Sequence, residues 1–457
     1  MKQLFIKHNG NPRLLLIFAG WAMDHRPFID VRCSGYDIAV VWDYRNDNLD
    51  INAFSTYSEV TVMAWSMGVW AASRIIPQSE LPVTLTIAVN GSYAPVDDRK
   101  GIPTDIYNAT LNALTPASLT KFYRRMAGNA DNYARFAEML PQRQADELAD
   151  ELRHIADVGP ASGHMRWDKA VISTHDAIFP ASNLREAWCG NSEIIEIGAP
   201  HLPDFQWIIN RWVIDKCLVT ERFSRSRHSY DSEATVQNRV ADHLWALWQK
   251  YLEPQKISSL IEIGYGTGYF TGLYASRVHP PTWRMWDLIP AATANLPVGC
   301  DAEQCDAETA ILNVAPQSVD VIVSSSAIQW FNSIAAFLAN CANALKSGGM
   351  AVISTFGDLT FRELAQAGAA SLPYVTESSL RAMIPDCFEI IELHQGIITR
   401  AFNSPAEVMR HIQATGVNAL RRSRPTSELR HLLASYPLSH GRAMLTYNPV
   451  YLIIRRK

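Results

Sequence analysis

The sequence predicts an α/β protein of two domains, each built on a mostly parallel sheet with helices packed against it. Three observations lead to this prediction. Short apolar segments alternate with helix-forming segments in both halves of the chain, as in doubly wound sheets. In the first half, a strand passes into a helix through the serine-containing turn AWSMG at 64–68. In the second half, a strand passes into a helix through a glycine-rich turn at 264–268.

The composition is that of a globular protein and favours neither a metal site nor a nucleic-acid-binding surface. With 457 residues, two domains of about 200 residues each are expected. A net charge of −4 does not favour nucleic-acid binding, and seven cysteines without a C-x-x-C pair do not favour a metal site or a disulfide framework. No apolar run reaches the roughly 18 residues of a membrane span, and the N-terminal segment lacks a signal-peptide cleavage site. We therefore expect a cytoplasmic protein that does not enter a membrane.

Six apolar segments in the first half are expected to form one sheet, and LLLIFAG is expected to be its first core strand. In chain order the six segments are 14–20, 36–44, 60–65, 83–91, 170–176 and 193–198. Ligands of such sheets bind at the carboxyl ends of the strands. Gly20 and Asp176 end two of these segments, and Ser66 and His201 follow two others, so we expect all four at the same edge.

Ser66 stands at the apex of the AWSMG turn, between the strand VTVMAW and the helix-forming VWAASRII. A nucleophile elbow needs small residues two positions before and after its serine, because the turn crowds the strand against the helix. Ala64 and Gly68 meet this requirement. Such a turn exposes the hydroxyl and brings the Met67 amide beside it. An ordinary strand–helix turn is the alternative, which a five-residue pattern alone does not exclude.

A serine becomes a nucleophile when a base and an orienting carboxylate accompany it, and in α/β-hydrolases their chain order is Ser, Asp, His. Asp176 follows the strand AVIST, and His201 follows the next strand 25 residues later. A helix-capping aspartate and a surface histidine are the alternatives, but order, placement and spacing together favour a triad with Ser66. The glycine turn after the first strand would add the Trp21 amide to that of Met67 as an oxyanion hole.

The strand pattern stops between about 101 and 164, where helical segments replace it. An insertion between core strands of a hydrolase usually forms a cap over the serine. Lys121, Arg124 and Arg125 on this insertion could meet an acidic carrier protein, although basic faces are more often simply solvated.

Five motifs of the first half, FAGWAMD, VVWDYRN, AWSMG, DAIFP and APHLPDF, occur in this order over 1–214. Together they resemble the pimeloyl-[acyl-carrier protein] methyl ester esterases of the BioG type. The resemblance implies an α/β-hydrolase fold with a helical cap. It also implies that Ser66, Asp176 and His201 form the catalytic triad.

We place the domain boundary near Thr220, which gives domains 1–219 and 220–457. The next expected strand, 257–263, runs into an acidic residue and three glycines, Glu262, Gly264, Gly266 and Gly268. The glycines let the backbone approach a ligand closely, but dinucleotide-binding folds share their spacing. The acidic residue before them favours the D/E-x-G-x-G-x-G motif of class I (Rossmann-like) methyltransferases, which binds the methionine part of S-adenosylmethionine.

Asp287 ends the strand WRMWD, 25 residues after Glu262, and would accept the ribose hydroxyls. Asp306 and Ala307 would lie near the adenine. Carboxylates suit a ribose, whereas no basic residue stands ready for the phosphates of NAD. A helix cap at Asp287 and a turn at Asp306 are the alternatives. The ordered set favours S-adenosylmethionine as the ligand, with S-adenosylhomocysteine as its product. The fourth and fifth strands of this sheet are expected in SVDVIVSSSAIQWF and LKSGGMAVISTF.

A helix is expected from Ser229 through TVQNRVADHLWALW. With SSSAIQWF and the late HIQATGVNAL, it resembles malonyl-[acyl-carrier protein] O-methyltransferases of the BioC type over 221–457. By this resemblance Tyr230 would sit over the donor methyl group; a core aromatic at a helix start is the alternative. The terminal MLTYNPVYLIIRRK is expected to be one closing strand.

The two resemblances imply one pathway, biotin biosynthesis. Methylation removes the charge of the malonyl carboxylate, which would be costly to bury in the apolar channels of fatty-acid synthesis, and the ester is hydrolysed later. The expected partner is acyl-carrier protein carrying malonyl or pimeloyl methyl ester. Two other interpretations remain: a small-molecule O-methyltransferase fused to an unrelated carboxylesterase, or one inactive half that docks carrier protein.

Overall fold

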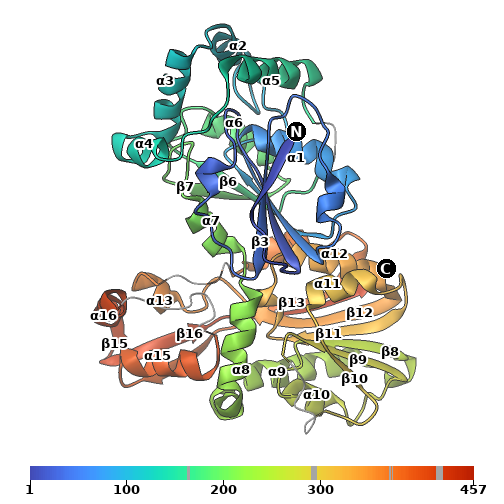
Figure 1. Cartoon of the computed structure of the whole chain (residues 1–457). Helices are drawn as coiled ribbons and strands as arrows, with labels where there is room; N and C mark the ends of the chain where they lie inside the picture. The colour runs from blue at the N-terminus through green and yellow to red at the C-terminus, as the bar shows by residue number, and fades with distance from the viewer. Residues whose placement is uncertain (162–164, 290–295, 370–371, 373, 418–425) are drawn as a thin grey trace. The chain divides into compact units, whose positions relative to one another are not determined.

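The chain divides into two compact units, Met1–Val213 and Ile214–Lys457. The computed structural model describes residues 1–161, 165–289, 296–369, 372, 374–417 and 426–457 (Figure 1). Thr220, near which the sequence analysis placed the domain boundary, lies inside helix α8 (Lys216–Glu233). The division falls before this helix.

The first unit contains a seven-stranded sheet in the order β1-β3-β2-β4-β5-β6-β7. All neighbours are parallel except the antiparallel pair β1–β3. The strands are β1 (Lys2–Lys7), β2 (Arg13–Phe18), β3 (Tyr36–Trp42), β4 (Glu59–Trp65), β5 (Val83–Val89), β6 (Lys169–Ser173) and β7 (Glu193–Ile197). The six expected strands are present, but LLLIFAG is not the first. The preceding KQLFIK forms the edge strand β1, whose side chains are exposed or half-buried, so it lacks a continuous apolar run.

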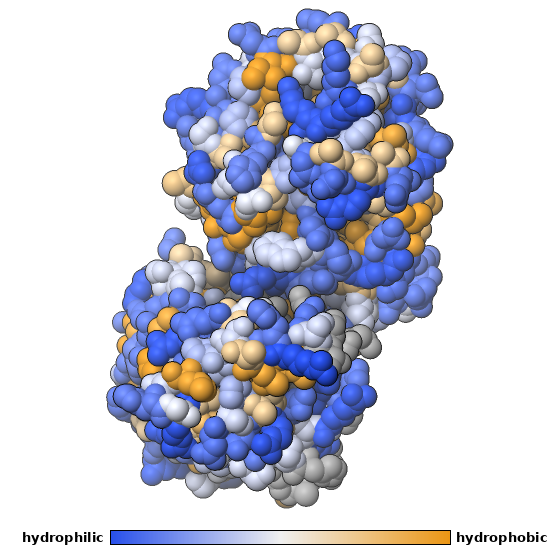
Figure 2. All heavy atoms as spheres, turned by 90° about the vertical axis from the view of Figure 1, so that its left-hand side faces the viewer, coloured by the Kyte–Doolittle hydropathy of each residue, from blue (hydrophilic) through white to orange (hydrophobic). Residues whose placement is uncertain are grey.

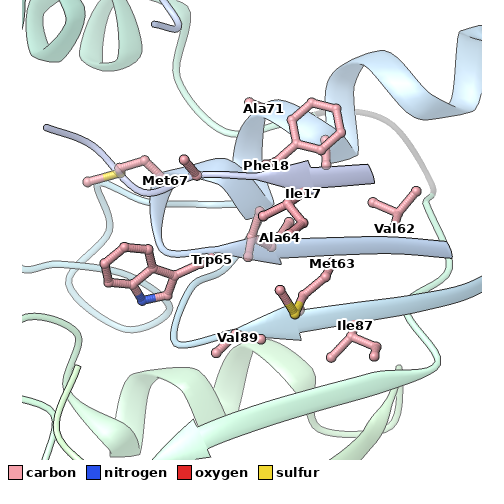
Figure 3. Packing of buried hydrophobic residues seen from close by; sticks show 14 of the residues in the cluster. Ile17, Phe18, Val62, Met63, Ala64, Trp65, Met67, Ala71, Ile87 and Val89 are labelled. Atoms are coloured by element: carbon pink, nitrogen blue, oxygen red, sulfur yellow. The ribbon is translucent and has the colours of Figure 1, made fainter. Parts of the chain in front are cut away.

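Strand β4 lies between β2 and β5 at the centre of this sheet, and all seven of its residues are buried. Figure 3 shows Val62 to Trp65 of β4 packed with Ile17 and Phe18 of β2 and with Ile87 and Val89 of β5. A parallel sheet covered on both faces requires such continuous apolar strands. The dense packing fixes the position at which β4 ends and the turn at Ser66 begins.

Four helices form the insertion between β5 and β6, and they gather in one group apart from the sheet (Figure 1). They are α2 (Thr104–Asn112), α3 (Pro116–Ala127), α4 (Ala130–Ala137) and α5 (Ala145–Val158); the other helices of the unit are α1 (Met67–Ile75), α6 (Ala181–Trp188) and α7 (Phe205–Trp212). The Trp21 indole N–H donates to the Leu148 carbonyl of α5 at 3.0 Å, which ties the insertion to the core. Residues 162–164 of the expected insertion lie outside the described residues.

The second unit contains a seven-stranded sheet in the order β10-β9-β8-β11-β12-β17-β13. Its neighbours are parallel except β17, which is antiparallel to both β12 and β13. The strands are β8 (Ser259–Ile263), β9 (Thr282–Asp287), β10 (Asp301–Gln304), β11 (Val319–Ser325), β12 (Leu345–Phe356), β13 (Phe388–Gln395) and β17 (Pro449–Arg456). A separate antiparallel sheet contains β14 (Ile398–Phe402), β15 (Leu438–Ser439) and β16 (Arg442–Tyr447).

The C-terminal segment forms two strands rather than the single closing strand that we expected. β16 ends at Tyr447 and β17 begins at Pro449, and the two strands belong to different sheets. Proline lacks an N–H and therefore suits the first position of a strand. The side chain of Asn448, between them, is buried and donates to the Gly396 carbonyl at 2.8 Å, which holds the crossing point.

Helices lie beside both sheets of the second unit (Figure 1). They are α8 (Lys216–Glu233), α9 (Thr235–Trp248), α10 (Tyr269–Tyr274), α11 (Ala307–Ala310), α12 (Ile334–Ala344), α13 (Arg362–Gln366), α14 (Glu377–Met383), α15 (Pro405–Ala414) and α16 (Thr426–Ser435). The helix expected from Ser229 is two helices, because α8 begins before it and ends at Glu233. Residues 418–420 of HIQATGVNAL lie outside the described residues.

Hydrophilic side chains dominate the visible surface of each unit, and hydrophobic ones form small separate patches (Figure 2). Of the helices in the described ranges, none combines the length and the apolar character that a membrane crossing requires.

Candidate functional sites

Ser66 occupies a strained turn between β4 and α1. Its φ of 59° lies in the left-handed region, which residues other than glycine rarely adopt. Its amide donates to the Val89 carbonyl at 2.9 Å. A Cβ on Gly68 would lie 2.4 Å from the Phe18 carbonyl oxygen, so the small residue expected at this position is required. This is the geometry of a nucleophile elbow.

The structure brings Ser66, His201 and Asp176 together in one hydrogen-bonded set. His201 Nε2 lies 3.0 Å from Ser66 Oγ, and His201 Nδ1 lies 2.7 Å from Asp176 Oδ2. The second carboxylate oxygen of Asp176 accepts from the amides of Ile178 and Phe179 at 2.7 and 2.9 Å. Ser66 and His201 are only 5% and 1% exposed. The arrangement can move a proton from the hydroxyl to an imidazole that a fixed carboxylate orients.

Two residues that the sequence analysis missed hold this set in place. The side-chain amide of Asn90 donates to Ser173 Oγ at 2.8 Å and to the His201 carbonyl at 2.9 Å, so it connects the end of β6 to the loop after β7. Gly91 packs against the serine turn, since a Cβ there would lie 2.2 Å from the Ser66 carbonyl oxygen. The Asn-Gly pair directly after β5, at the same sheet edge as Ser66, was the signal that could have revealed them.

A pocket that contains Ser66 is lined mainly by the helical insertion. Trp21 and Met67, the two residues expected to supply the oxyanion hole, both line it. The remaining lining residues are mostly apolar: Ile102, Ile106, Tyr107, Thr110, Phe122, Arg125, Leu152 and Ile178. The pocket encloses about 380 Å³ of space, part of it open to solvent. It suits an extended apolar chain that ends at the serine.

Of the three basic residues predicted to meet a carrier protein, only Arg125 lines the Ser66 pocket. All three side chains are exposed on α3. The Arg124 guanidinium lies 5.2 Å from the centre of the Tyr133 ring. Within the described residues, neither Lys121 nor Arg125 forms an ion pair with an acidic side chain.

The second unit contains a larger pocket, with about 970 Å³ of space, at the carboxyl ends of β8, β9 and β11. Gly264, Gly266 and Gly268 adopt positive φ values of 69°, 57° and 87°. A Cβ on Gly264 would lie 2.3 Å from the Ala327 Cβ, whereas a Cβ on Gly266 would meet no atom within 4 Å. The turn therefore leaves space for a ligand directly above Gly266. Gly268 does not line the pocket; it caps α10.

Asp287, Asp306 and Ala307, the residues predicted to bind the nucleoside, line this pocket. Oδ2 of Asp287 accepts from the Gly266 amide at 2.9 Å, and Oδ1 accepts from the Ile289 amide at 2.9 Å. Burial raises the pKa of this carboxyl group, and the two amide donors oppose the effect. A fixed carboxylate beside an open glycine turn fits a nucleoside whose ribose hydroxyls need an acceptor.

Glu262 does not reach the pocket, contrary to its expected part in binding the donor. Successive side chains of a strand point to opposite faces, and Ile263 takes the pocket side. The Glu262 carboxylate is instead 1% exposed and accepts from the hydroxyls of Thr271, at 2.9 Å, and Tyr274 of α10. Burial raises its pKa to about 7, although these hydroxyls oppose the effect.

Lys216 is a pocket residue that the sequence analysis missed. It is 1% exposed, and its Nζ forms an ion pair with Asp306 at 2.6 Å and another with Glu308. The Glu308 carboxylate also accepts from the amides of Asn332 and Ser333, each at 2.9 Å. Asp306 caps α11 and also lines the pocket. A lone lysine in the apolar run VIDKCLV was the only local signal.

Tyr230 lies on α8 and lines the donor-side pocket and a smaller chamber beside it. Its ring centre lies 6.1 Å from that of Phe223 on the same helix. It therefore stands where two ligands could meet.

Comparison with known proteins identifies both units. The family "Pimeloyl-ACP methyl esterase BioG" matches residues 1–212, and the family "Methyltransferase domain" matches residues 261–353. The malonyl-[acyl-carrier protein] O-methyltransferase of Bacteroides fragilis (strain 638R) is 33% identical over 468 residues, which cover 97% of this chain and 93% of that protein. A protein of the same name from Haemophilus influenzae is 29% identical over 53% of this chain and 95% of its own length.

The solved structure of BioG from Haemophilus influenzae is 32% identical and covers 44% of this chain and 94% of its own, with a TM-score of 0.41. The sequence comparisons confirm the two resemblances, the α/β class of both domains and S-adenosylmethionine as the cofactor. Because the similarity extends over nearly the whole chain, this protein belongs to the malonyl-[acyl-carrier protein] O-methyltransferase family, with a BioG domain preceding its methyltransferase domain.

Proposed function

We propose that this chain is a bifunctional enzyme of biotin-precursor synthesis. Its second unit methylates the free carboxylate of malonyl-acyl-carrier protein, and its first unit hydrolyses the methyl ester of pimeloyl-acyl-carrier protein. The observation that carries this proposal is the presence, in one chain of this family, of the bonded set Ser66–His201–Asp176 and of a glycine-lined pocket with Asp287 beside it.

In the methyl transfer, S-adenosylmethionine supplies a methyl group on a sulfonium sulfur: an oxygen–carbon bond to the substrate forms as the sulfur–carbon bond breaks and its electron pair passes to sulfur. The acceptor carboxylate is already ionised near pH 7, so no strong base is needed. Asp287 would accept from the ribose hydroxyls, and Asp306 with Ala307 would line the adenine. Tyr230 would lie over the transferred methyl group. Positioning and exclusion of water then account for the rate.

In ester hydrolysis, Ser66 Oγ attacks the ester carbonyl carbon while His201 Nε2 takes the hydroxyl proton and Asp176 holds the imidazole. The amides of Trp21 and Met67 would stabilise the negative oxygen. His201 then returns the proton to the leaving methoxy oxygen, which departs as methanol. Water then attacks the acyl-serine carbonyl carbon as His201 takes a proton from it; His201 returns this proton to Ser66 Oγ as the acyl–Oγ bond breaks and the free acid is released.

Because the same chain would form one methyl ester and hydrolyse another, the esterase must not hydrolyse the malonyl ester. Both substrates carry the same ester group, so the acyl chain must distinguish them, and pimeloyl is longer by four methylenes. At about 0.8 kcal/mol per buried methylene, a groove for the longer chain gains roughly 3 kcal/mol, about a hundredfold in kcat/KM. The apolar lining that the insertion supplies to the Ser66 pocket supports this role.

Arg125, exposed on α3 and lining the Ser66 pocket, is suited to an acidic carrier whose acyl chain enters there. We therefore place the carrier for the hydrolytic step on this face, with Lys121 and Arg124 as neighbouring contacts. Loss of a rim charge of this kind mainly slows association and makes it less sensitive to salt.

Mass spectrometry of carrier proteins tests the whole proposal. In the presence of S-adenosylmethionine, the purified chain should raise the mass of malonyl-carrier protein by about 14 mass units. It should lower the mass of pimeloyl-methyl-ester carrier protein by the same amount. Ser66→Ala should lower the hydrolysis rate by orders of magnitude and leave methylation unchanged. Methylation of free small acids in preference to the carrier-linked malonyl group would favour the alternative of a small-molecule methyltransferase. Absence of one activity would favour a docking half.

A further inference from the structure

A second chamber adjoins the donor pocket of the methyltransferase unit. It encloses about 340 Å³ of space, part of it open to solvent. Four residues line both cavities and so form the boundary across which a methyl group would pass: Phe223, Tyr230, Ser326 and Trp330. Ser326 follows β11, and Trp330 ends the short 3-10 helix η8 (Ile328–Trp330).

Two polar groups on this boundary lack partners. Among the described residues, neither the Ser326 hydroxyl nor the Trp330 indole N–H has a hydrogen-bond partner, although both atoms are enclosed. Trp330 as a whole is only 6% exposed, and its ring meets Phe223 edge-on at 5.6 Å. A buried polar group without a partner costs about 1–3 kcal/mol, so such groups call for a ligand or another explanation.

The backbone holds Ser326 in place at some cost. Its φ is 58°, in the left-handed region that serine rarely adopts. Its amide donates to the Ser354 carbonyl at 3.0 Å and lies 3.2 Å from Ser354 Oγ, both on the neighbouring strand β12. Local strain of this kind persists where the surroundings over-determine it, often at binding sites. Neighbouring β12 therefore fixes the position from which this hydroxyl projects.

The described lining of the chamber contains hydrogen-bonding groups but no acidic, basic or histidine side chain. Besides the four boundary residues, it consists of Gln237, Gln329, Phe356, Thr360, Phe361, Tyr374, Val417 and Tyr447. A cationic acceptor would find no counter-charge here, and a large apolar one would leave the polar groups unpaired. A short acyl group that ends in a hydrogen-bond acceptor needs no counter-charge from an acidic side chain and can pair with both unpartnered donors of the boundary.

We infer that this chamber is the acceptor site of the methyltransferase unit, where the Ser326 hydroxyl and the Trp330 indole N–H donate hydrogen bonds to the carboxylate of the malonyl group. The inference rests on the proposed function and adds to it the residues that recognise the substrate. Two neutral donors partly replace the water that a buried carboxylate loses. An arginine would form a stronger pair with the carboxylate and would withdraw electron density from the attacking oxygen, whereas neutral donors leave that oxygen reactive.

Binding of carrier protein to the full chain tests the inference without turnover. The chain is first saturated with sinefungin, an inert donor analogue that keeps a positive charge at the methyl position. Calorimetry then compares malonyl-carrier protein with holo-carrier protein, which lacks the malonyl group. Ser326→Ala removes one donor with little change of shape, and Trp330→Phe removes the other donor together with part of the indole ring. Each should weaken malonyl-carrier binding, and raise KM in turnover, by roughly tenfold or more. Affinity for holo-carrier protein should not change, and the sinefungin affinity of each variant, measured separately, shows whether its donor pocket is intact.

Ser324→Ala is the matched control. This hydroxyl lies on β11, the strand that precedes Ser326, but donates to the Ile263 carbonyl at 3.1 Å and lines neither cavity. It should lower thermal stability without changing malonyl-carrier affinity. Unchanged malonyl-carrier affinity in both test variants would overturn the inference, as would a wild-type chain that binds malonyl- and holo-carrier protein equally. If one variant fails to bind sinefungin, the malonyl-carrier affinity of the other variant tests the inference. A wild-type chain that binds malonyl-carrier protein through these residues but never methylates it would instead refute the proposed function.

Discussion

Lys216 Nζ lies 2.6 Å from Asp306 Oδ2, although the two residues are 90 positions apart in the chain. The lysine begins α8, the helix that carries Tyr230, and the aspartate caps α11 on the wall of the donor pocket. The same Nζ forms a second ion pair with the Glu308 carboxylate. One buried cation therefore joins the N-terminal helix of the methyltransferase unit to the residues expected beside the adenine.

Removing this cation should destabilise the second unit strongly, because Lys216→Met takes the Nζ charge away from the buried Glu308 carboxylate and from the half-buried Asp306 carboxylate. Breaking a buried pair in this way costs about 3–5 kcal/mol. Scanning calorimetry would measure the effect on the transition that S-adenosylhomocysteine shifts. Lys250→Met is the control, since Lys250 is 57% exposed and lies 3.8 Å from Glu392; it should change stability by no more than about 0.5 kcal/mol. Equal effects of the two substitutions would contradict the buried network.

The raised pKa of Glu262 predicts a pH-dependent stability. The pKa is about 7 in the folded chain against 4.5 in the unfolded one. Between these values the folded state binds the proton more strongly, so the contribution of Glu262 to stability is highest below pH 4.5, falls as the pH rises, and levels off above about 7. The difference between the two pKa values corresponds to a loss of about 3 kcal/mol.

Glu262→Gln removes this titration and keeps an oxygen that can accept from Thr271 and Tyr274. Relative to wild type, the variant should gain about 3 kcal/mol in the free energy of unfolding between pH 4.5 and pH 8. Urea unfolding at several pH values measures this gain. Glu389→Gln, whose side chain is 58% exposed, should show no such dependence. A constant difference between Glu262→Gln and wild type across this range would show that Glu262 is ionised throughout.

Asp287→Ala should weaken S-adenosylmethionine binding by about 1.5–3 kcal/mol, the range for a hydrogen bond to a charged group. The substitution also removes the acceptor of the Gly266 and Ile289 amides, which shape the turn. Calorimetric titration measures the affinity, and hydrolysis of the pimeloyl ester serves as the internal check of folding. Asp301→Ala, on the exposed strand β10 of the same unit, should leave the affinity unchanged. Full affinity in a folded Asp287→Ala variant would exclude the ribose-binding role.

The preference of the esterase for the longer chain should depend on the apolar insertion. Phe122→Ala removes a large side chain from the Ser66 pocket, and the ratio of kcat/KM for the pimeloyl and malonyl esters should fall roughly tenfold. Leu140 belongs to the same insertion but lies outside the pocket, so Leu140→Ala should leave the ratio of the two kcat/KM values unchanged. Steady-state rates on both carrier-linked esters decide the matter. Near-equal rates on the two esters for the intact chain would refute selection by chain length.

The sequence by itself predicted the features whose signals are local. Apolar runs broken by turn residues located the parallel strands, because strands buried on both faces must be continuously apolar. Ser66, Asp176 and His201 each follow such a strand, and the carboxyl ends of parallel strands share one edge of a sheet. Their convergence therefore followed from chain order alone. The glycine turn and Asp287 came together by the same reasoning.

Only the tertiary structure decided the features that depend on distant partners. Asn90 finds Ser173 at a separation of 83 residues, and the burial of Lys216 depends on carboxylates 90 and 92 residues away. Glu262 turned away from the pocket because its orientation depends on which face of β8 receives α10. The edge strand β1 and the division of the C-terminal segment into two strands at Asn448 were also not predicted from the sequence. Local propensity sets the period and the turns of a chain, but the pairing of buried polar groups is set by which elements pack together, and short-range sequence does not specify that.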